Sequence, residues 1–133
     1  WQDVVAKTLD HFGRLDVLVN NAGLVRFGTV EDAELADFRL QMQVMVEGCF
    51  LGCKTAIPHM TKTGGGSIIN VASVAALKGI SSIPADAAGL DQVHAQGQGQ
   101  PEDVANLVLF LASEESRQIT GTHIVIDNGE TMG

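Results

Sequence analysis

The sequence predicts an α/β fold with a short, mainly parallel sheet of about three strands flanked by helices. Short apolar runs rich in β-branched residues occur within residues 15–21, 67–72 and 123–127, as in strands buried on both faces. Segments with helical spacing separate these runs. Alternating strands and helices favour a parallel sheet built through crossover connections.

The first half of the chain gives the clearest elements. Residues 1–12 place apolar side chains at helical spacing, and Gly13 follows as a C-terminal stop. The first strand is then expected within residues 15–21. Residues 31–37 predict a short acidic helix or turn, and residues 38–61 predict a long helix with an almost wholly apolar inner face.

Three consecutive glycines end that long helix, and the second strand follows at residues 67–72. Residues 74–100 are the least regular, because glycine and proline interrupt any long period, and we expect a loop with one short helix at residues 85–96. Pro101 and the two carboxylates after it predict a helix start, since both suit the first turn. Residues 123–127 would form the third strand.

Length and charge narrow the functional classes. A chain of 133 residues is long enough for one domain, here expected to span residues 1–133. The net charge of −8 argues against nucleic acid as a partner. The sequence has no apolar run of membrane-spanning length and no signal-peptide pattern, so we expect a cytoplasmic protein with no membrane partner.

Two cysteines, Cys49 and Cys53, lie four residues apart on one face of the predicted long helix. This spacing does not favour disulfide geometry, so we interpret them as two small buried residues. A metal site that includes His59 is the alternative, but it would have only two soft ligands and a distant imidazole. We therefore expect no metal site.

Four segments together resemble the short-chain dehydrogenase/reductase family in its usual order. The segments are residues 15–23, residues 47–50, residues 66–73, and residues 99–105 through 127–129. A strand ending in Asn-Asn-Ala-Gly is moderately specific, and its combination with Ile-Asn-Val-Ala-Ser and a Gln-Pro-Glu-Asp-Val-Ala helix is highly specific. The resemblance implies a reduced, Rossmann-like three-layer fold.

The same resemblance implies oxidoreduction of alcohols and carbonyls through Asn, Ser, Tyr and Lys side chains. Only Ser73 matches this set, because Asp86 stands in the Tyr position and Leu90 in the Lys position, and Met45 replaces the helical Asn. A carboxyl group with an ordinary pKa of about 4 is a poor proton donor at neutral pH. The family comparison therefore implies a degenerate, truncated member whose hydride-transfer chemistry is lost.

The family's cofactor is NAD or NADP, and the resemblance places Asn21, Ala22 and Gly23 at the nicotinamide-ribose site. The family's Gly-rich phosphate-binding turn does not precede Trp1. We therefore expect no cofactor unless the phosphate site is supplied elsewhere. The alternative interpretation of residues 20–23 is a purely structural turn at the end of the strand.

Two further functions stay open. Asp86, Asp91 and His94 with Ser73 are candidate acid, base and nucleophile groups of a small hydrolase acting on an unknown small molecule. The alternative, which we favour for the carboxylates, is that these charges belong to a solvated loop; Ser73 could also be a strand cap. The other is a non-catalytic oligomerising module. In the family the long helix builds a dimer interface, so we expect a homo-oligomer, through the helix or the edge of the first strand.

Overall fold

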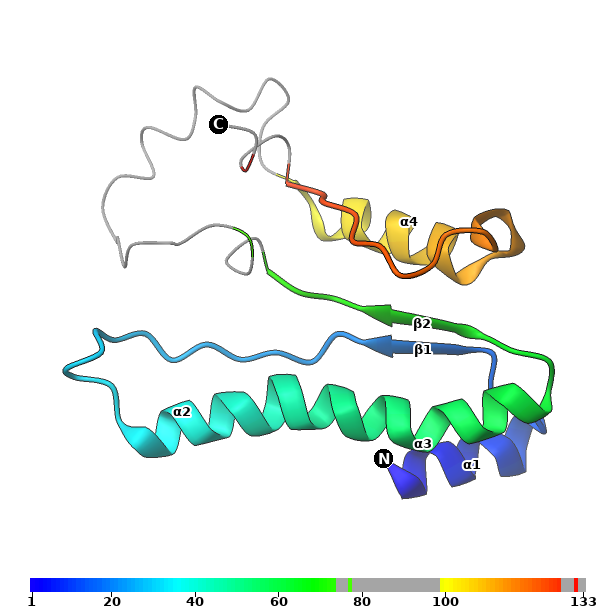
Figure 1. The fold of residues 1–133 in the computed structure, drawn as a ribbon, viewed down its shortest axis with the longest axis horizontal. Coiled ribbons are helices and arrows are strands. Elements are labelled where there is room, and N and C mark those ends of the chain that lie inside the picture. The colour runs from blue at the N-terminus through cyan, green and yellow to red at the C-terminus, as the bar shows by residue number, and fades with distance from the viewer. Residues whose placement is uncertain (74–76, 78–98, 128–130, 132–133) are drawn as a thin grey trace. The chain divides into compact units, whose positions relative to one another are not determined.

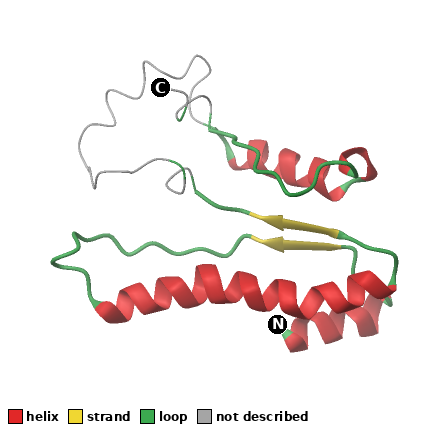
Figure 2. Ribbon diagram, in the orientation of Figure 1, coloured by secondary structure: helices red, strands yellow, loops and turns green. Residues whose placement is uncertain are grey.

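The computed structural model describes residues 1–73, 77, 99–127 and 131, and it divides into two compact units, Trp1–Val71 and Ala72–Gly133. Helices and strands alternate along the first unit (Figures 1 and 2). Its elements are α1 (Gln2–Phe12), β1 (Val17–Asn20), α2 (Leu35–Met42), the π-helix η1 (Gln43–Glu47), α3 (Gly48–Lys62) and β2 (Ser67–Asn70). The second unit contains α4 (Pro101–Ala112) and the 3-10 helix η4 (Glu114–Ser116). The predicted α/β class is confirmed.

The first unit is a strand–helix–strand arrangement. β1 and β2 pair in parallel, with Val17 opposite Ser67 and Asn20 opposite Asn70. One backbone bond extends the pairing beyond each end, from Ser67 N–H to the Asp16 oxygen and from Val71 N–H to the Asn20 oxygen. Both strands therefore lie inside their predicted ranges and end together at the carboxyl edge of the sheet.

The connection between the strands is one continuous helical segment over residues 35–62. It starts three residues earlier than predicted, because a turn at residues 30–32 ends the loop and leaves Leu35 to begin the helix. Its middle, at residues 43–47, widens to a π-helix, a form that occurs mostly as short bulges inside α-helices. Among the described residues, no helix combines the length and the apolar character that a bilayer crossing requires.

The core of the first unit lies between α3 and the sheet. Leu18, Ala56 and Met60 are buried together, and Ile68 packs against them. Ala56 is completely buried, and one turn earlier the buried Gly52 presents no side chain at all. A Cβ atom at Gly52 would lie 2.6 Å from the Asn20 Oδ1 and 3.0 Å from a Trp1 ring carbon. The small residues therefore allow close approach of α3 to β1 and to the start of α1.

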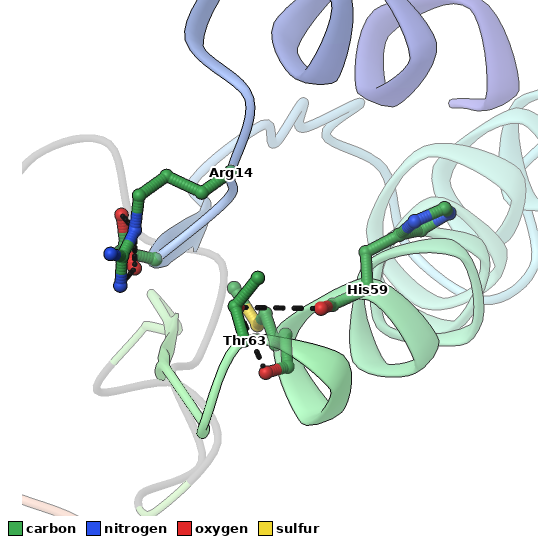
Figure 3. Close-up of polar contacts among 5 residues, drawn as sticks. Arg14, His59 and Thr63 are labelled. Carbon is green, nitrogen blue, oxygen red and sulfur yellow. Dashed lines mark hydrogen bonds and ion pairs between the residues drawn. The ribbon is translucent and has the colours of Figure 1, made fainter.

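The amino edge of the sheet is held by short-range polar contacts (Figure 3). The Arg14 guanidinium donates to both carboxylate oxygens of Asp16 at 2.7 to 2.9 Å, just before β1 begins. At the end of α3, the Thr63 hydroxyl donates to the Met60 and His59 carbonyl oxygens. These bonds satisfy carbonyls that a helix end leaves without intrahelical partners.

The predicted helix start at Pro101 is confirmed in the second unit. Pro101 opens α4, and the Gln100 N–H donates to the Asp103 carboxylate at 2.8 Å. This contact is half of a capping box, which satisfies a backbone donor at the helix start. The short helix predicted at residues 85–96 lies outside the described residues.

The predicted third strand at residues 123–127 is wrong. These residues have no strand structure, and Ile124, Val125 and Ile126 are each 43 to 44% exposed. A strand buried on both faces would leave its side chains much less exposed than this. An apolar run favours burial, but a strand also needs a neighbouring strand as its hydrogen-bond partner. The described sheet contains only β1 and β2.

The close approach at Gly52 predicts a cost for the smallest possible side chain there. Gly52→Ala should lower the free energy of unfolding by about 1–3 kcal/mol, because the new methyl group overlaps the hydrogen-bonded Asn20 amide. Urea unfolding, followed by circular dichroism, measures this change.

Gly48→Ala is the matched control on the same helix. Its Cβ would meet only the Gln43 carbonyl oxygen, at an ordinary 3.5 Å, so the higher helix propensity of alanine should raise stability by up to about 1 kcal/mol. Equal or greater stability of Gly52→Ala relative to Gly48→Ala would show that α3 does not approach β1 this closely.

Candidate functional site

The candidate site of the first unit lies at the carboxyl edge of the sheet. Open α/β sheets bind their ligands outside this edge, because the loops that leave the strands gather there. Asn20 and Asn70 are the last residues of β1 and β2 and stand in register. The loop at residues 21–23 continues directly from β1.

A side-chain bond joins the two strand ends. The Asn20 Nδ2 donates to the Asn70 Oδ1 at 2.9 Å. Each asparagine also contacts α3, because the Asn20 Nδ2 lies 3.6 Å from the Cys53 Sγ and the Cys49 Sγ donates to the Asn70 Oδ1 at 3.2 Å. The two amides and two thiols thus connect both strands to one face of α3.

The remaining amide oxygen of this pair has no matching donor. Asn20 Oδ1 is buried and makes no hydrogen bond among the described residues. Leaving a buried acceptor unsatisfied costs about 1–3 kcal/mol. The oxygen faces the open position that Gly52 leaves on α3, so the absence of a side chain there makes room for the amide.

Both cysteines are free thiols and partly buried. Burial raises the pKa of the Cys49 thiol, and the nearby Cys53 raises it further. Cys49 is therefore protonated at neutral pH, in agreement with its role as a donor to Asn70. Within the described part of the chain, no three His, Cys, Asp or Glu side chains are grouped as metal ligands.

The loop after β1 borders open space. Asn21, Ala22 and Gly23 are all exposed, and a Cβ atom at Gly23 would meet no atom of the described residues within 4 Å. The loop therefore leaves room for a ligand at the end of β1. The assignment of these three residues to a cofactor stays a prediction.

The predicted catalytic residues are only partly described. Ser73 is exposed and follows Asn70 by three residues, in the second unit. Asp86, Asp91 and His94 lie outside the described residues, as does Leu90. Their joint role in catalysis stays a prediction.

Met45 lies inside the π-helix η1 and is 41% exposed. Its thioether is only a weak hydrogen-bond acceptor and has no proton to donate. In the family that the sequence resembles, this position carries an asparagine, whose amide can donate a hydrogen bond. Met45 cannot donate one, and it lies where the described helix changes from α-helical to π-helical geometry.

The asparagine pair was missed by sequence reasoning. Asn20 and Asn70 each stand near the end of a predicted strand, which is a visible signal. Their pairing requires the register of the sheet, because a shift by one residue would direct one of the two side chains to the opposite face. The structure supplies that register.

Comparisons with protein-family models cover nearly the whole chain. Residues 1–89 match the family described as short chain dehydrogenase, and residues 84–131 match the one described as enoyl-(acyl carrier protein) reductase.

Proteins of similar sequence are named as dehydrogenases or oxidoreductases. The trans-4-hydroxycyclohexanecarboxylate dehydrogenase of Sinomonas cyclohexanicum is 34% identical over an alignment that covers 100% of this chain and 67% of that protein. The 3-alpha-(or 20-beta)-hydroxysteroid dehydrogenase of Mycobacterium tuberculosis is 30% identical with the same coverage. An uncharacterized oxidoreductase of Thermotoga maritima is 51% identical, but over 59% of this chain and 32% of its own.

These alignments also show a difference in length. The alignment with the Sinomonas protein runs over 174 positions although this chain has 133 residues. Part of the relative's chain inside the matched range therefore has no counterpart here.

Solved structures share the fold. A short-chain dehydrogenase/reductase from Burkholderia xenovorans superposes with a TM-score of 0.86 at 27% identity, covering 99% of this chain and 70% of that one. A structure described as ElxO with NADP bound gives the same TM-score at 24% identity, covering 99% of this chain and 73% of the other. With the family models, the relatives and these folds in agreement, the chain belongs to the short-chain dehydrogenase/reductase family.

Proposed function

We propose that this protein keeps the nucleotide-facing edge of a short-chain dehydrogenase/reductase but does not itself catalyse hydride transfer. The observation that carries the proposal is the absence of tyrosine from the chain. The position that the family gives to its catalytic Tyr falls at Asp86, inside the stretch where the two family models meet. Its loss is therefore internal to the chain and independent of where the chain begins or ends.

Two further replacements support the proposal. Leu90, in the position of the family's Lys, has no charge with which to lower the pKa of a neighbouring hydroxyl or to bind a ribose oxygen. Met45, in the position of the family's Asn, has no proton donor. Ser73 alone can still orient a substrate oxygen, and orientation without an acid or base gives little proton transfer.

NAD or NADP is the nucleotide that we expect at the carboxyl edge, because it is the family's cofactor. The open loop at residues 21–23 is suited to the nicotinamide-ribose half, since it is exposed and unobstructed next to the end of β1. Asn21, Ala22 and Gly23 carry no positive charge with which to hold the phosphates of the nucleotide. We therefore expect weak binding by this chain alone.

The names of the similar proteins favour one substrate class. The Sinomonas enzyme and a 30% identical 2,5-dichloro-2,5-cyclohexadiene-1,4-diol dehydrogenase are named for hydroxyl groups on carbocyclic rings. The 3-alpha-hydroxyl in the name of the Mycobacterium tuberculosis enzyme is also a ring hydroxyl. We therefore choose alicyclic secondary alcohols as the test substrates. The hydrolase alternative receives no support from the described residues, because three of its four candidate groups lie outside them.

An oligomeric role is the second candidate, and the exposed apolar face of the long helix favours it. Phe38, Met42, Val46 and Phe50 recur at intervals of four and are each 41 to 60% exposed. An apolar stripe of this kind on a protein surface marks an interaction site, and a second copy of this chain is the partner that we propose.

The proposed loss of chemistry predicts no turnover by the natural sequence. With NAD⁺ or NADP⁺ and trans-4-hydroxycyclohexanecarboxylate, nucleotide reduction at 340 nm should stay at the rate without protein. Introducing Met45→Asn, Asp86→Tyr and Leu90→Lys together should produce a measurable rate. These substitutions restore the family's amide, its proton-donating hydroxyl and its ammonium group, in that order.

The control adds Ser73→Ala to that triple variant and should abolish the gained activity. Turnover by the natural sequence that Ser73→Ala removes would contradict the proposal. It would show that the remaining groups suffice for hydride transfer.

The open space at residue 23 allows a test of nucleotide contact with little effect on folding. Gly23→Val should leave the unfolding midpoint unchanged, since its Cβ would meet none of the described atoms within 4 Å. It should weaken NADH binding about tenfold, equivalent to about 1.4 kcal/mol, if the loop holds the nicotinamide ribose.

A titration followed by NADH fluorescence measures the dissociation constant. Gly28→Val, further along the same loop, is the control and should bind NADH as tightly as the natural sequence does. Identical affinities of the natural, Gly23→Val and Gly28→Val proteins would show that the loop does not contact the nucleotide. Absence of NADH binding to the natural sequence up to millimolar concentration would refute the proposal that this edge binds a nucleotide.

The apolar stripe predicts a charge-sensitive assembly. Val46→Glu with Phe50→Glu should convert an oligomer to a monomer, because buried carboxylates without partners are strongly disfavoured. Light scattering coupled to size exclusion measures the molar mass. The control Phe27→Glu, at a loop residue that is 92% exposed, should leave the mass unchanged, and a monomeric natural sequence would refute this proposal.

A further inference from the structure

The two thiols of α3 and the two strand-end amides form a continuous set of polar contacts. Cys49 donates to Asn70, Asn70 accepts from Asn20, and Asn20 donates toward Cys53. Cys49 and Cys53 are one helical turn apart on α3, so their side chains project from the same face of the helix. Both sulfur atoms are therefore directed toward the same small region above the strand ends.

This geometry is unsuited to a disulfide but suited to a bridging atom. Residues one turn apart on a helix have Cβ atoms about 5–6 Å apart, whereas a disulfide requires about 3.5–4.5 Å. An atom placed between the two sulfurs removes that mismatch, since two bonds to sulfur replace the single sulfur–sulfur bond of a disulfide.

The donor set selects a soft ligand. Two thiols and neutral amides provide no carboxylate or imidazole, and the described part of the chain holds no group of three metal-ligating side chains. Hard cations prefer carboxylate and carbonyl oxygens in larger numbers, while soft centres prefer thiolate sulfur. The ligand that fits this site is therefore a soft atom that needs only two bonds to sulfur.

We propose that Cys49 and Cys53 form a dithiol site that binds a soft, thiophilic centre of the trivalent arsenical class. With an organic arsenoxide, two arsenic–sulfur bonds form and the arsenic–oxygen bond breaks. The two thiol protons leave with that oxygen as one water molecule. No atom changes oxidation state, so the step needs no oxidant or reductant.

The surrounding residues accommodate the bound form. Cys49 loses its hydrogen bond to Asn70 when its proton leaves, but the Asn70 Oδ1 keeps the 2.9 Å bond from Asn20. Asn20 Nδ2 can still donate toward the sulfur of Cys53, which remains an acceptor. Only one of the contacts that join α3 to the strand ends is therefore lost.

The test uses phenylarsine oxide and the full chain. Intact-mass spectrometry of the folded protein should show one phenylarsenic group per chain, retained in excess glutathione, because two linked thiols compete with a monothiol through a high effective concentration. Cys49→Ser and Cys53→Ser should each hold the group at least about tenfold less well, since only one bond to arsenic remains.

The matched control keeps two thiols but moves one off the shared face. In the double variant Cys53→Ser with Leu51→Cys, the thiols lie two residues apart and do not face each other, so retention should fall to the level of the single-cysteine variants. Circular dichroism confirms that each variant is folded. Fluorescence of Trp1, the only tryptophan, supplies a second signal because its ring lies against Gly52, between the two cysteines in sequence.

Either of two results would overturn the proposal. One is equal retention by the Leu51→Cys control and the natural sequence, which would show that the helix face is irrelevant. The other is release from the natural sequence to glutathione as fast as from the single-cysteine variants, which would show that the two sulfurs do not act together.

Discussion

Close packing of α3 against β1 is the constraint on which the first unit depends. Gly52 and Ala56 present almost no side chain to the sheet, so the helix approaches near enough for Leu18 and Met60 to be buried between them. The same approach brings the thiols of α3 within hydrogen-bond distance of the strand-end asparagines. A larger residue at either small position would separate the core and the polar cluster together. Stability and the geometry of the carboxyl edge are therefore set by one contact.

The carboxyl edge combines retained and altered features of the family. The turn Asn21-Ala22-Gly23 is in place and open to solvent, and Ser73 follows the second strand closely in the chain. By contrast, the helical position with an amide in the family carries Met45, and the chain has no tyrosine. Under the proposed function, this edge binds nucleotide without catalysing hydride transfer, because binding depends on backbone shape whereas proton transfer depends on a few side chains.

Local signals in the sequence predicted most of the helices and strands that the structure describes. Gly13 ends α1 with a φ of 75°, a left-handed conformation that glycine adopts without strain, and Pro101 opens α4. These residues act through their own backbone preferences, so their effect is visible without knowledge of the fold. The run at residues 123–127 carries an equally clear strand pattern but forms no strand. Its conformation depends on a neighbouring strand, and periodicity alone carries no information about neighbours.

The sequence by itself determined the α/β class, the order of the elements in the first unit and the family, because local backbone preferences and motif order are written in consecutive residues. The tertiary structure decided the pairing of Asn20 with Asn70, the position of both cysteines above that pair and the close approach at Gly52. These features join residues that are 21 positions apart for Cys49 and Asn70 and 50 apart for Asn20 and Asn70, and they depend on strand register and helix placement. Both are fixed only when the core packs, since a shift of one residue would turn the same side chains to the other face.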